Sequence, residues 1–189
     1  MKIRELRDED LVDAVRILAL CFEKELITIF RDLDLAREIL KEFFKEHKEG
    51  CYVAEDGRVL AFAWLLSEKP KILKFLKSQV GFLNALRAYL LLKFFLRSQK
   101  NGEVYLAFIA VSPLRQRAGI GSALMNEIIK QAKFKNFRSM NCIVQADSEA
   151  VLFFKNLGFE IRNFFENRLA EKYFSAKEWV LLSKDLSAR

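Results

Sequence analysis

A strand, a glycine-containing loop and a helix follow one another in residues 103–133, and this unit constrains the fold more than any other part of the chain. Residues 103–111 are mostly β-branched, aromatic or aliphatic, which predicts a largely buried strand. Pro113 ends it, because proline has no backbone N–H to donate to a neighbouring strand. After the loop, apolar residues recur at helical spacing, at Ala123, Leu124, Ile128, Ile129 and Ala132.

The loop, residues 116–122, has the features of an anion-binding turn. Gly119 and Gly121 allow a tight turn and the close approach of a ligand. The first turn of the next helix leaves its N–H groups free at the positive end of the helix dipole, which suits a phosphate or pyrophosphate. The loop lacks the Lys-Ser/Thr pair of a Walker A motif and the third glycine of a dinucleotide fingerprint. An ordinary strand-to-helix turn that contains glycine is the alternative.

Two motifs carry a resemblance to a known family. Gln116-x-x-Gly119-x-Gly121, preceded by the strand, resembles motif A of the GNAT acetyltransferase superfamily, which holds the pyrophosphate of coenzyme A. Residues 147–159 resemble the motif B of that family at five positions, Asp147, Ala150, Phe154, Gly158 and Phe159. Both motifs occur in the order of the family with a predicted strand between them. The chain is therefore similar to GNAT N-acetyltransferases.

The pattern of elements along the chain agrees with this resemblance. We expect an α/β protein, because strands alternate with helices in the second half and a hairpin turns at Asp56-Gly57 in the first. The resemblance implies a mixed, mostly antiparallel sheet flanked by helices, with splayed central strands that admit the pantetheine arm of the coenzyme. The expected strands are residues 2–7, 51–55, 59–66, 103–111, 139–145, 160–165 and 178–183, and the expected helices are 8–25, 34–47, 120–133, 147–156 and 168–174.

The resemblance also implies a reaction and a set of binding residues. The reaction is transfer of acetyl from acetyl-CoA to a primary amine of a small molecule or protein, directly in a ternary complex. The N–H of Ile109 would stabilise the oxyanion, and Val111 would pair with the pantetheine arm. The residues expected to bind the coenzyme are Ile109, Ala110, Val111, Gln116, Arg117, Ala118, Gly119, Ile120, Gly121, Ser122, Asp147 and Phe154.

The proton-transfer groups depart from the family pattern. A protonated amine must lose a proton before it attacks, and Glu103 or Tyr105, two residues apart at the start of the central strand, are the candidate bases. Phe154 stands where the family usually has a tyrosine that protonates the departing thiolate. Either water or Tyr173 would serve instead, or the thiolate would leave unassisted and catalysis would be slow. Asp147 replaces the usual asparagine and is expected to cap its helix. A non-catalytic coenzyme A sensor or interaction module is therefore the alternative function.

Composition limits the remaining possibilities. A chain of 189 residues fits a single domain, 1–189. Three separated cysteines and one histidine suggest neither disulfides nor a metal site. The charged first residues do not resemble a signal peptide, so a cytoplasmic location is expected.

Residues 67–100 interrupt the family pattern as a basic, apolar helical insertion. They contain eight basic residues and one acidic residue, which accounts for the entire net charge of +7. Residues 81–96 are almost all apolar but too few to span a bilayer. We favour an arm packed on the sheet or across a homodimer, stable at high salt. A lid over a hydrophobic acceptor pocket and binding to an anionic membrane surface are alternatives, and nucleic acid is not expected because aliphatic residues separate the basic ones.

Overall fold

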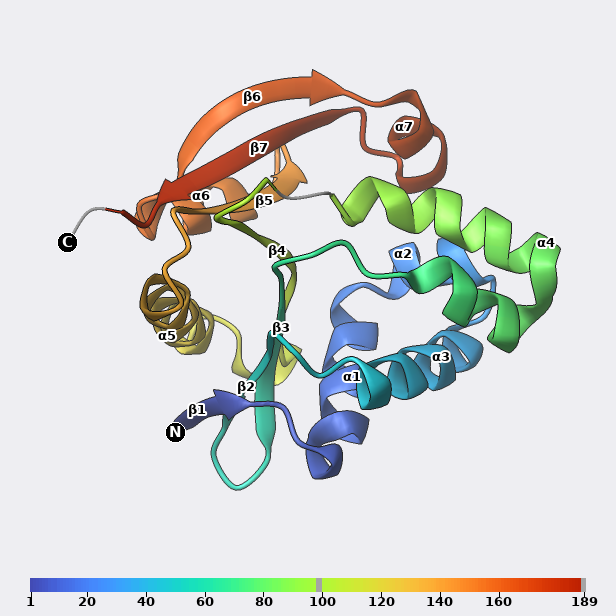
Figure 1. Cartoon of the computed structure of the whole chain (residues 1–189), viewed down its shortest axis with the longest axis horizontal. Coiled ribbons are helices and arrows are strands. Elements are labelled where there is room, and N and C mark those ends of the chain that lie inside the picture. The colour runs from blue at the N-terminus through green and yellow to red at the C-terminus, as the bar shows by residue number, and fades with distance from the viewer. Residues whose placement is uncertain (98–99, 188–189) are drawn as a thin grey trace.

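The computed structural model describes residues 1–97 and 100–187. It is a mixed α/β fold with one seven-stranded sheet in the order β1-β2-β3-β4-β5-β7-β6 (Figure 1). The strands are β1 (Lys2–Glu5), β2 (Cys51–Glu55), β3 (Val59–Leu66), β4 (Glu103–Val111), β5 (Ser139–Gln145), β6 (Glu160–Glu166) and β7 (Glu178–Asp185). The helices are α1 (Leu11–Cys21), α2 (Glu23–Phe30), α3 (Leu33–Glu46), α4 (Ile72–Phe95), α5 (Ile120–Phe134), α6 (Glu149–Asn156) and α7 (Arg168–Phe174). All neighbouring strands are antiparallel except β4 and β5.

The two parallel strands β4 and β5 part soon after they begin. They pair only through their first three residues, and Tyr105 opposite Asn141 is the last pair. Beyond it β4 stays with β3 as far as Val111 opposite Ala61, whereas β5 stays with β7 as far as Gln145 opposite Trp179. The expected splay of the central strands is therefore confirmed, and it opens a wedge in the middle of the sheet.

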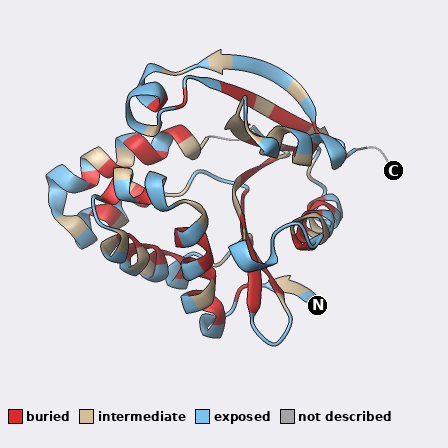
Figure 2. Ribbon diagram, turned by 180° about the vertical axis from the view of Figure 1, so that it is seen from behind, coloured by how far each residue is buried: buried red, intermediate tan, exposed pale blue. Residues whose placement is uncertain are grey.

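Helices cover both faces of the sheet and form two apolar cores. Helices α1 to α4 pack on one face, where the buried residues include Phe43, Phe62 and Tyr105. Helices α5 and α6 pack on the other, around Met125 and Leu182. Figure 2 shows buried positions concentrated along the central strands and on the sheet-facing sides of the helices. The two layers explain why all eight residues of β3 are buried.

The N-terminal region differs from the sequence prediction. The prediction of a single helix over 8–25 is wrong. A short 3₁₀ helix (Asp8–Asp10) precedes α1, and the helix is interrupted at Phe22, between α1 and α2. The predicted cap Asp8 lies on the surface. Instead Asp10 folds back and accepts hydrogen bonds from the Arg7 backbone N–H at 2.8 Å and from the Arg4 guanidinium at 2.6 and 2.9 Å. This buried carboxylate ties β1 to the start of α1.

The inserted segment folds into α4, whose axis bends at Gly81. That residue has φ of +73°, a conformation that glycine adopts without strain, so two helical halves meet at an angle there. One face of α4 packs into the core with α2 and α3, through Leu76, Ala88 and Leu92. At its end, Phe94 packs edge-on against Trp179 of β7, with ring centroids 4.7 Å apart. The segment therefore packs as an arm on its own chain, which is one of the arrangements expected from the sequence.

The helix of motif B begins one residue later than predicted. Ser148 occupies the cap position of α6, and Asp147 is an exposed residue whose side chain does not cap the helix. At the other end, Gly158 has φ of +81°, and the Phe159 N–H donates to the Phe154 carbonyl over 3.0 Å. This geometry is the glycine-terminated helix end that the sequence indicated.

Candidate active site

The wedge between β4 and β5 continues into an open cleft of about 620 Å³, a size that suits a large ligand. Its walls come from the end of β4, the motif A loop, the first turn of α5 and one side of α6. The lining residues are Cys21, Ile109, Ala110, Val111, Arg115, Gln116, Arg117, Gly119, Ile120, Gly121, Ser122, Glu149, Ala150, Leu152, Phe153 and Asn156. Both motifs read from the sequence therefore face the same cleft.

The backbone of β4 presents the peptide groups of two residues, Ile109 and Val111, to the wedge. The Ser112 N–H donates to the Leu60 carbonyl of β3 over 2.8 Å. Backbone groups of successive residues in a strand point to opposite sides, so Ala110 also faces β3, while Ile109 and Val111 face away from it. On that side β5 has already departed. The N–H and C=O groups of Ile109 and the N–H group of Val111 therefore face a ligand in the wedge, unpaired with β5.

Two side chains hold the Val111 carbonyl. Gln116 Nε2 donates to it over 3.3 Å, which ties the motif A loop to the end of β4. The thiol Sγ of Cys21, at the end of α1, donates to the same oxygen over 3.3 Å. Burial raises the pKa of Cys21, so this thiol stays protonated at neutral pH. The sequence alone did not indicate Cys21, because its role depends on α1 ending beside β4.

The motif A loop has the geometry of an anion cradle. Gly119 caps α5 with φ of +77°, and a Cβ built on it meets no atom within 4 Å, so its backbone is open to the cleft. A Cβ on Gly121 would lie 3.3 Å from the Val111 side chain and 3.6 Å from the Phe153 ring. Across the cleft mouth, Arg117 pairs with Glu149 in the first turn of α6. The open N–H groups at the start of α5 fit the pyrophosphate of a coenzyme A.

Three predicted binding residues do not line the cleft. Phe154 is 3% exposed and packs in the core below α6, where its ring centroid lies 5.2 Å from that of Phe159. Its neighbour Phe153 lines the cleft instead. Asp147 is exposed outside it, and Ala118 belongs to the loop without facing the cavity. The missing tyrosine of motif B is therefore replaced here by a core phenylalanine.

The two predicted bases lie away from the cleft. Glu103 precedes Ile109 by six residues, which places it about 20 Å along the strand. It accepts hydrogen bonds from the Lys100 backbone and from Asn141 Nδ2, at 3.3 and 3.5 Å. Tyr105 is 2% exposed, and burial raises the pKa of its phenol far above the ordinary value. Neither side chain is placed to take a proton from an amine beside Ile109. Tyr173, the suggested acid, lies on α7 and does not line the cleft either.

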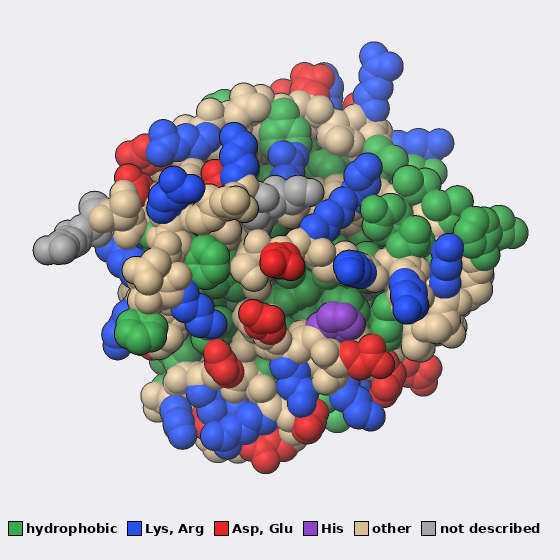
Figure 3. Space-filling model, viewed as in Figure 1, with side chains coloured by type: hydrophobic (Ala, Val, Ile, Leu, Met, Phe, Trp, Pro, Cys, Tyr) green, Lys and Arg blue, Asp and Glu red, His purple; other side chains and the backbone are tan. Residues whose placement is uncertain are grey.

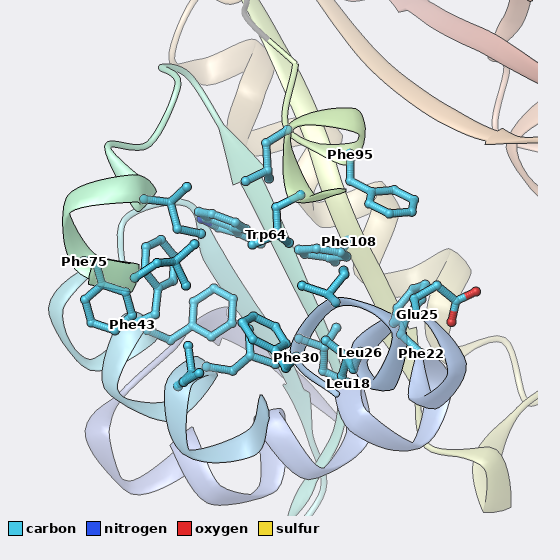
Figure 4. A pocket seen from close by; sticks show the side chains of 18 residues that line it. Leu18, Phe22, Glu25, Leu26, Phe30, Phe43, Trp64, Phe75, Phe95 and Phe108 are labelled. Atoms are coloured by element: carbon cyan, nitrogen blue, oxygen red, sulfur yellow. The ribbon is translucent and has the colours of Figure 1, made fainter. Parts of the chain in front are cut away.

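A second cavity lies on the opposite face of β4, between the strand and helices α1 to α4 (Figure 4). It is enclosed, has a volume of about 50 Å³ and exposes no polar surface. The cavity adjoins the cleft at two places where consecutive residues line different spaces. Phe22 and Phe108 line the cavity, whereas the adjacent residues Cys21 and Ile109 line the cleft. The rings of Phe22 and Phe108 meet edge to face, 5.7 Å apart, and form the wall between the two spaces.

Glu25 is the only charged side chain that lines this cavity in the described part of the chain. It lies on α2 four residues after Cys21, and its carboxylate points away from the apolar interior (Figure 4). It is half-buried, beside Phe22. Nothing in the sequence indicated Glu25 as a site residue, because a glutamate in the first turn of a helix is ordinarily solvated. A carboxylate at this point is able to hold or deprotonate a cationic amine.

Neither a metal site nor a membrane span is seen in residues 1–97 and 100–187. No group of three or more His, Cys, Asp or Glu side chains there could hold a metal ion. None of the helices in the same residues combines the length and the apolar character needed to cross a bilayer.

Comparisons with known proteins identify the family. Residues 11–159 match the model of the acetyltransferase (GNAT) family, so the chain belongs to that family. No curated protein matches the sequence. Among solved structures, the ribosomal-protein-alanine N-acetyltransferase from Brucella melitensis superposes with a TM-score of 0.68 at 18% identity, covering 98% of this chain and 99% of that one. Ard1 from Thermoplasma volcanium gives 0.62 at 20% identity, covering 97% and 96%. An N-acetyltransferase from Staphylococcus aureus gives 0.63 at 19% identity, covering 98% of each chain.

These similarities define an acyltransferase of the GNAT class. At such identities the solved structures show the shared fold, and the family match adds the type of reaction, for which acetyl-CoA is the usual donor.

Proposed function

We propose that this protein transfers acetyl from acetyl-CoA to a primary amine, directly, with both substrates bound at the wedge. The observation that supports this most strongly is the parting of β4 and β5 after Tyr105, because β5 then does not pair with the edge of β4 at Ile109 and Val111, beside the motif A loop. The loop and the first turn of α5 hold the pyrophosphate. The strand edge holds the pantetheine arm, so that the thioester lies beside Ile109.

The chain supplies three elements of the chemistry. The Ile109 N–H is directed at the wedge, where it stabilises negative charge that develops on the thioester oxygen as the amine attacks. Glu25 takes the proton from the amine, directly or through a water molecule. The thiolate that leaves receives a proton from water, which is sufficient because a thiol is far more acidic than an alkylammonium ion. The buried position of Phe154 is compatible with this route, since no tyrosine is needed.

The acceptor enters from the face of helices α1 and α2. The apolar cavity there is separated from Ile109 by the Phe22 and Phe108 rings, and successive residues of a strand point to opposite faces. We propose that the two rings part on binding, so that an amine near Glu25 places a small apolar group in the cavity while its nitrogen reaches the edge of β4. Three residues of the arm α4, Phe75, Leu92 and Phe95, line this cavity, which supports the alternative that the insertion covers a hydrophobic acceptor pocket.

The function is tested by measuring thiol release from acetyl-CoA with a panel of amines. The panel contains amines of equal charge in which the substituent on the carbon next to the nitrogen grows from hydrogen to methyl to isopropyl to benzyl. It also contains peptides whose N-terminal residues carry the same side chains. We expect turnover with amines that carry the small apolar groups and a loss of turnover with the benzyl compound, because the cavity is only about 50 Å³. Acetyl-CoA binding without turnover on any member would favour the non-catalytic binder instead.

A further inference from the structure

The outer face of α4 carries an apolar stripe that no other element covers within residues 1–97 and 100–187. Phe82, Leu83, Leu86 and Leu90 are 59%, 79%, 37% and 50% exposed. Their spacing places them on one side of the second half of the helix. The opposite side of the same half packs into the core, through Ala85, Ala88 and Leu92. Single exposed apolar residues are common on protein surfaces, but a continuous stripe of four marks an interaction surface.

The stripe is convex. Gly81 bends α4 immediately before Phe82, so that the two most exposed members, Phe82 and Leu83, lie at the corner where the halves of the helix meet. Figure 1 shows this corner of α4 at the edge of the molecule, and Figure 3 shows hydrophobic side chains gathered there with basic ones beside them. A protruding apolar corner fits a deformable partner better than a preformed pocket.

Lysines surround the stripe. Lys77 lies over the Phe82 ring, with Nζ 4.9 Å from the ring centroid, and Lys74 is one turn before it. At the other end, Lys69 and Lys93 line a shallow depression together with Leu90. These lysines and Lys71 are exposed, and the described residues show no ion pair for any of the five. The segment 67–100 has eight basic residues and one acidic residue, Glu68, so little within it offsets this charge.

We propose that the corner of α4 docks on an anionic lipid bilayer. Phe82 and Leu83 enter the boundary between head groups and acyl chains, and the surrounding lysines contact anionic head groups. Charge complementarity selects this partner over a second copy of the chain, because two such corners would bring their lysines together. The protein does not span the bilayer. Docking through the outer face of α4 would leave its inner face, which lines the apolar cavity, packed on the core.

The proposal is tested by co-sedimentation of the full chain with phosphatidylcholine vesicles, with and without phosphatidylserine. We expect binding only to the anionic vesicles and its loss at about 1 M salt, where the screening length is roughly 3 Å. Each lysine near an anionic surface strengthens binding by about fivefold, so Lys74→Gln/Lys77→Gln should weaken it by about 25-fold. The control Lys24→Gln/Lys41→Gln removes the same charge from exposed positions of α2 and α3 and should change it little.

A second pair of variants tests the apolar contact. Phe82→Asp should abolish binding, whereas Phe134→Asp, which replaces an 84% exposed phenylalanine between two lysines on α5, should not. Sedimentation equilibrium without lipid should show a monomer. Equal loss in both aspartate variants, equal binding to neutral vesicles, no binding to any vesicle, or a dimer that Phe82→Asp dissociates would each overturn the proposal. The last result would assign the stripe to contact between copies of the chain.

Discussion

The Sγ of Cys21 donates a hydrogen bond to the carbonyl oxygen of Val111 across 3.3 Å, and this contact joins the end of α1 to the strand edge at the wedge. The two residues are 90 positions apart in the chain. The contact places a protonated thiol on the wall of the cleft, next to the peptide groups that we assign to coenzyme binding. Cys51 and Cys142 are buried, so Cys21 is the accessible thiol of the three.

We therefore expect acetyl-CoA to protect Cys21 from alkylation. Burial raises the pKa of this thiol above its usual value of 9.0, so iodoacetamide should react slowly at neutral pH and faster as pH rises. Saturating acetyl-CoA should slow the reaction by about tenfold or more, since bound ligand leaves only the free protein reactive. Mass spectrometry of the labelled peptide measures the rate. Unchanged labelling in the presence of a ligand that raises the melting temperature would place the coenzyme elsewhere.

Gly121→Glu should abolish the thermal stabilisation given by acetyl-CoA. A Cβ at this position meets Val111 and Phe153, which both line the cleft, and a carboxylate there repels pyrophosphate. Asn126→Glu is the control, because it adds the same charge to an exposed site on the same helix. If Gly121→Glu fails to fold, Ser122→Glu tests the same loop from a residue that lines the cleft. An unaltered shift in melting temperature in a folded variant would refute the assignment of the loop.

Glu25→Gln should lower kcat/KM by about 10²-fold, the usual contribution of a general base, and leave acetyl-CoA affinity unchanged. Glu23→Gln, on the exposed side of the same helix, and Glu103→Gln, about 20 Å along the strand from Ile109, should both keep near-normal rates. A large effect of Glu103→Gln alone would return the base to the start of β4.

Asp10→Asn should lower the free energy of unfolding by about 2 kcal/mol, because it breaks a buried, charge-assisted network with Arg4. Hydrogen bonds from Arg4 hold the pKa of Asp10 below its ordinary value of 3.8. The stabilisation is therefore present above about pH 4 and is lost as pH falls through the lowered pKa. Urea unfolding between pH 2 and 7 measures both effects, with about 0.5 kcal/mol or less expected for Asp13→Asn, which breaks only a surface ion pair with Arg16. Equal losses in the two variants would contradict the buried network.

The sequence by itself determined the centre of the fold. The apolar run from Glu103 to Val111, the two glycines and the helical spacing after them sufficed to predict β4, the loop and α5, because these signals are local to the backbone. The same holds for the hairpin at Asp56-Gly57 and for the glycine at the end of α6. The match of two motifs to one family then predicted the splay of β4 and β5.

Only the tertiary structure decided which side chains face the site. Phe153 lines the cleft and Phe154 lies in the core, a distinction that depends on how α6 rotates against the sheet. Cys21 and Glu25 reach the site because the helix is interrupted at Phe22, and no local sequence signal marks that interruption. Similarly, composition showed that the insertion is apolar and basic. Packing against α2 and α3 determined which of its faces remains in water, since burial of a helix face is set by what it meets.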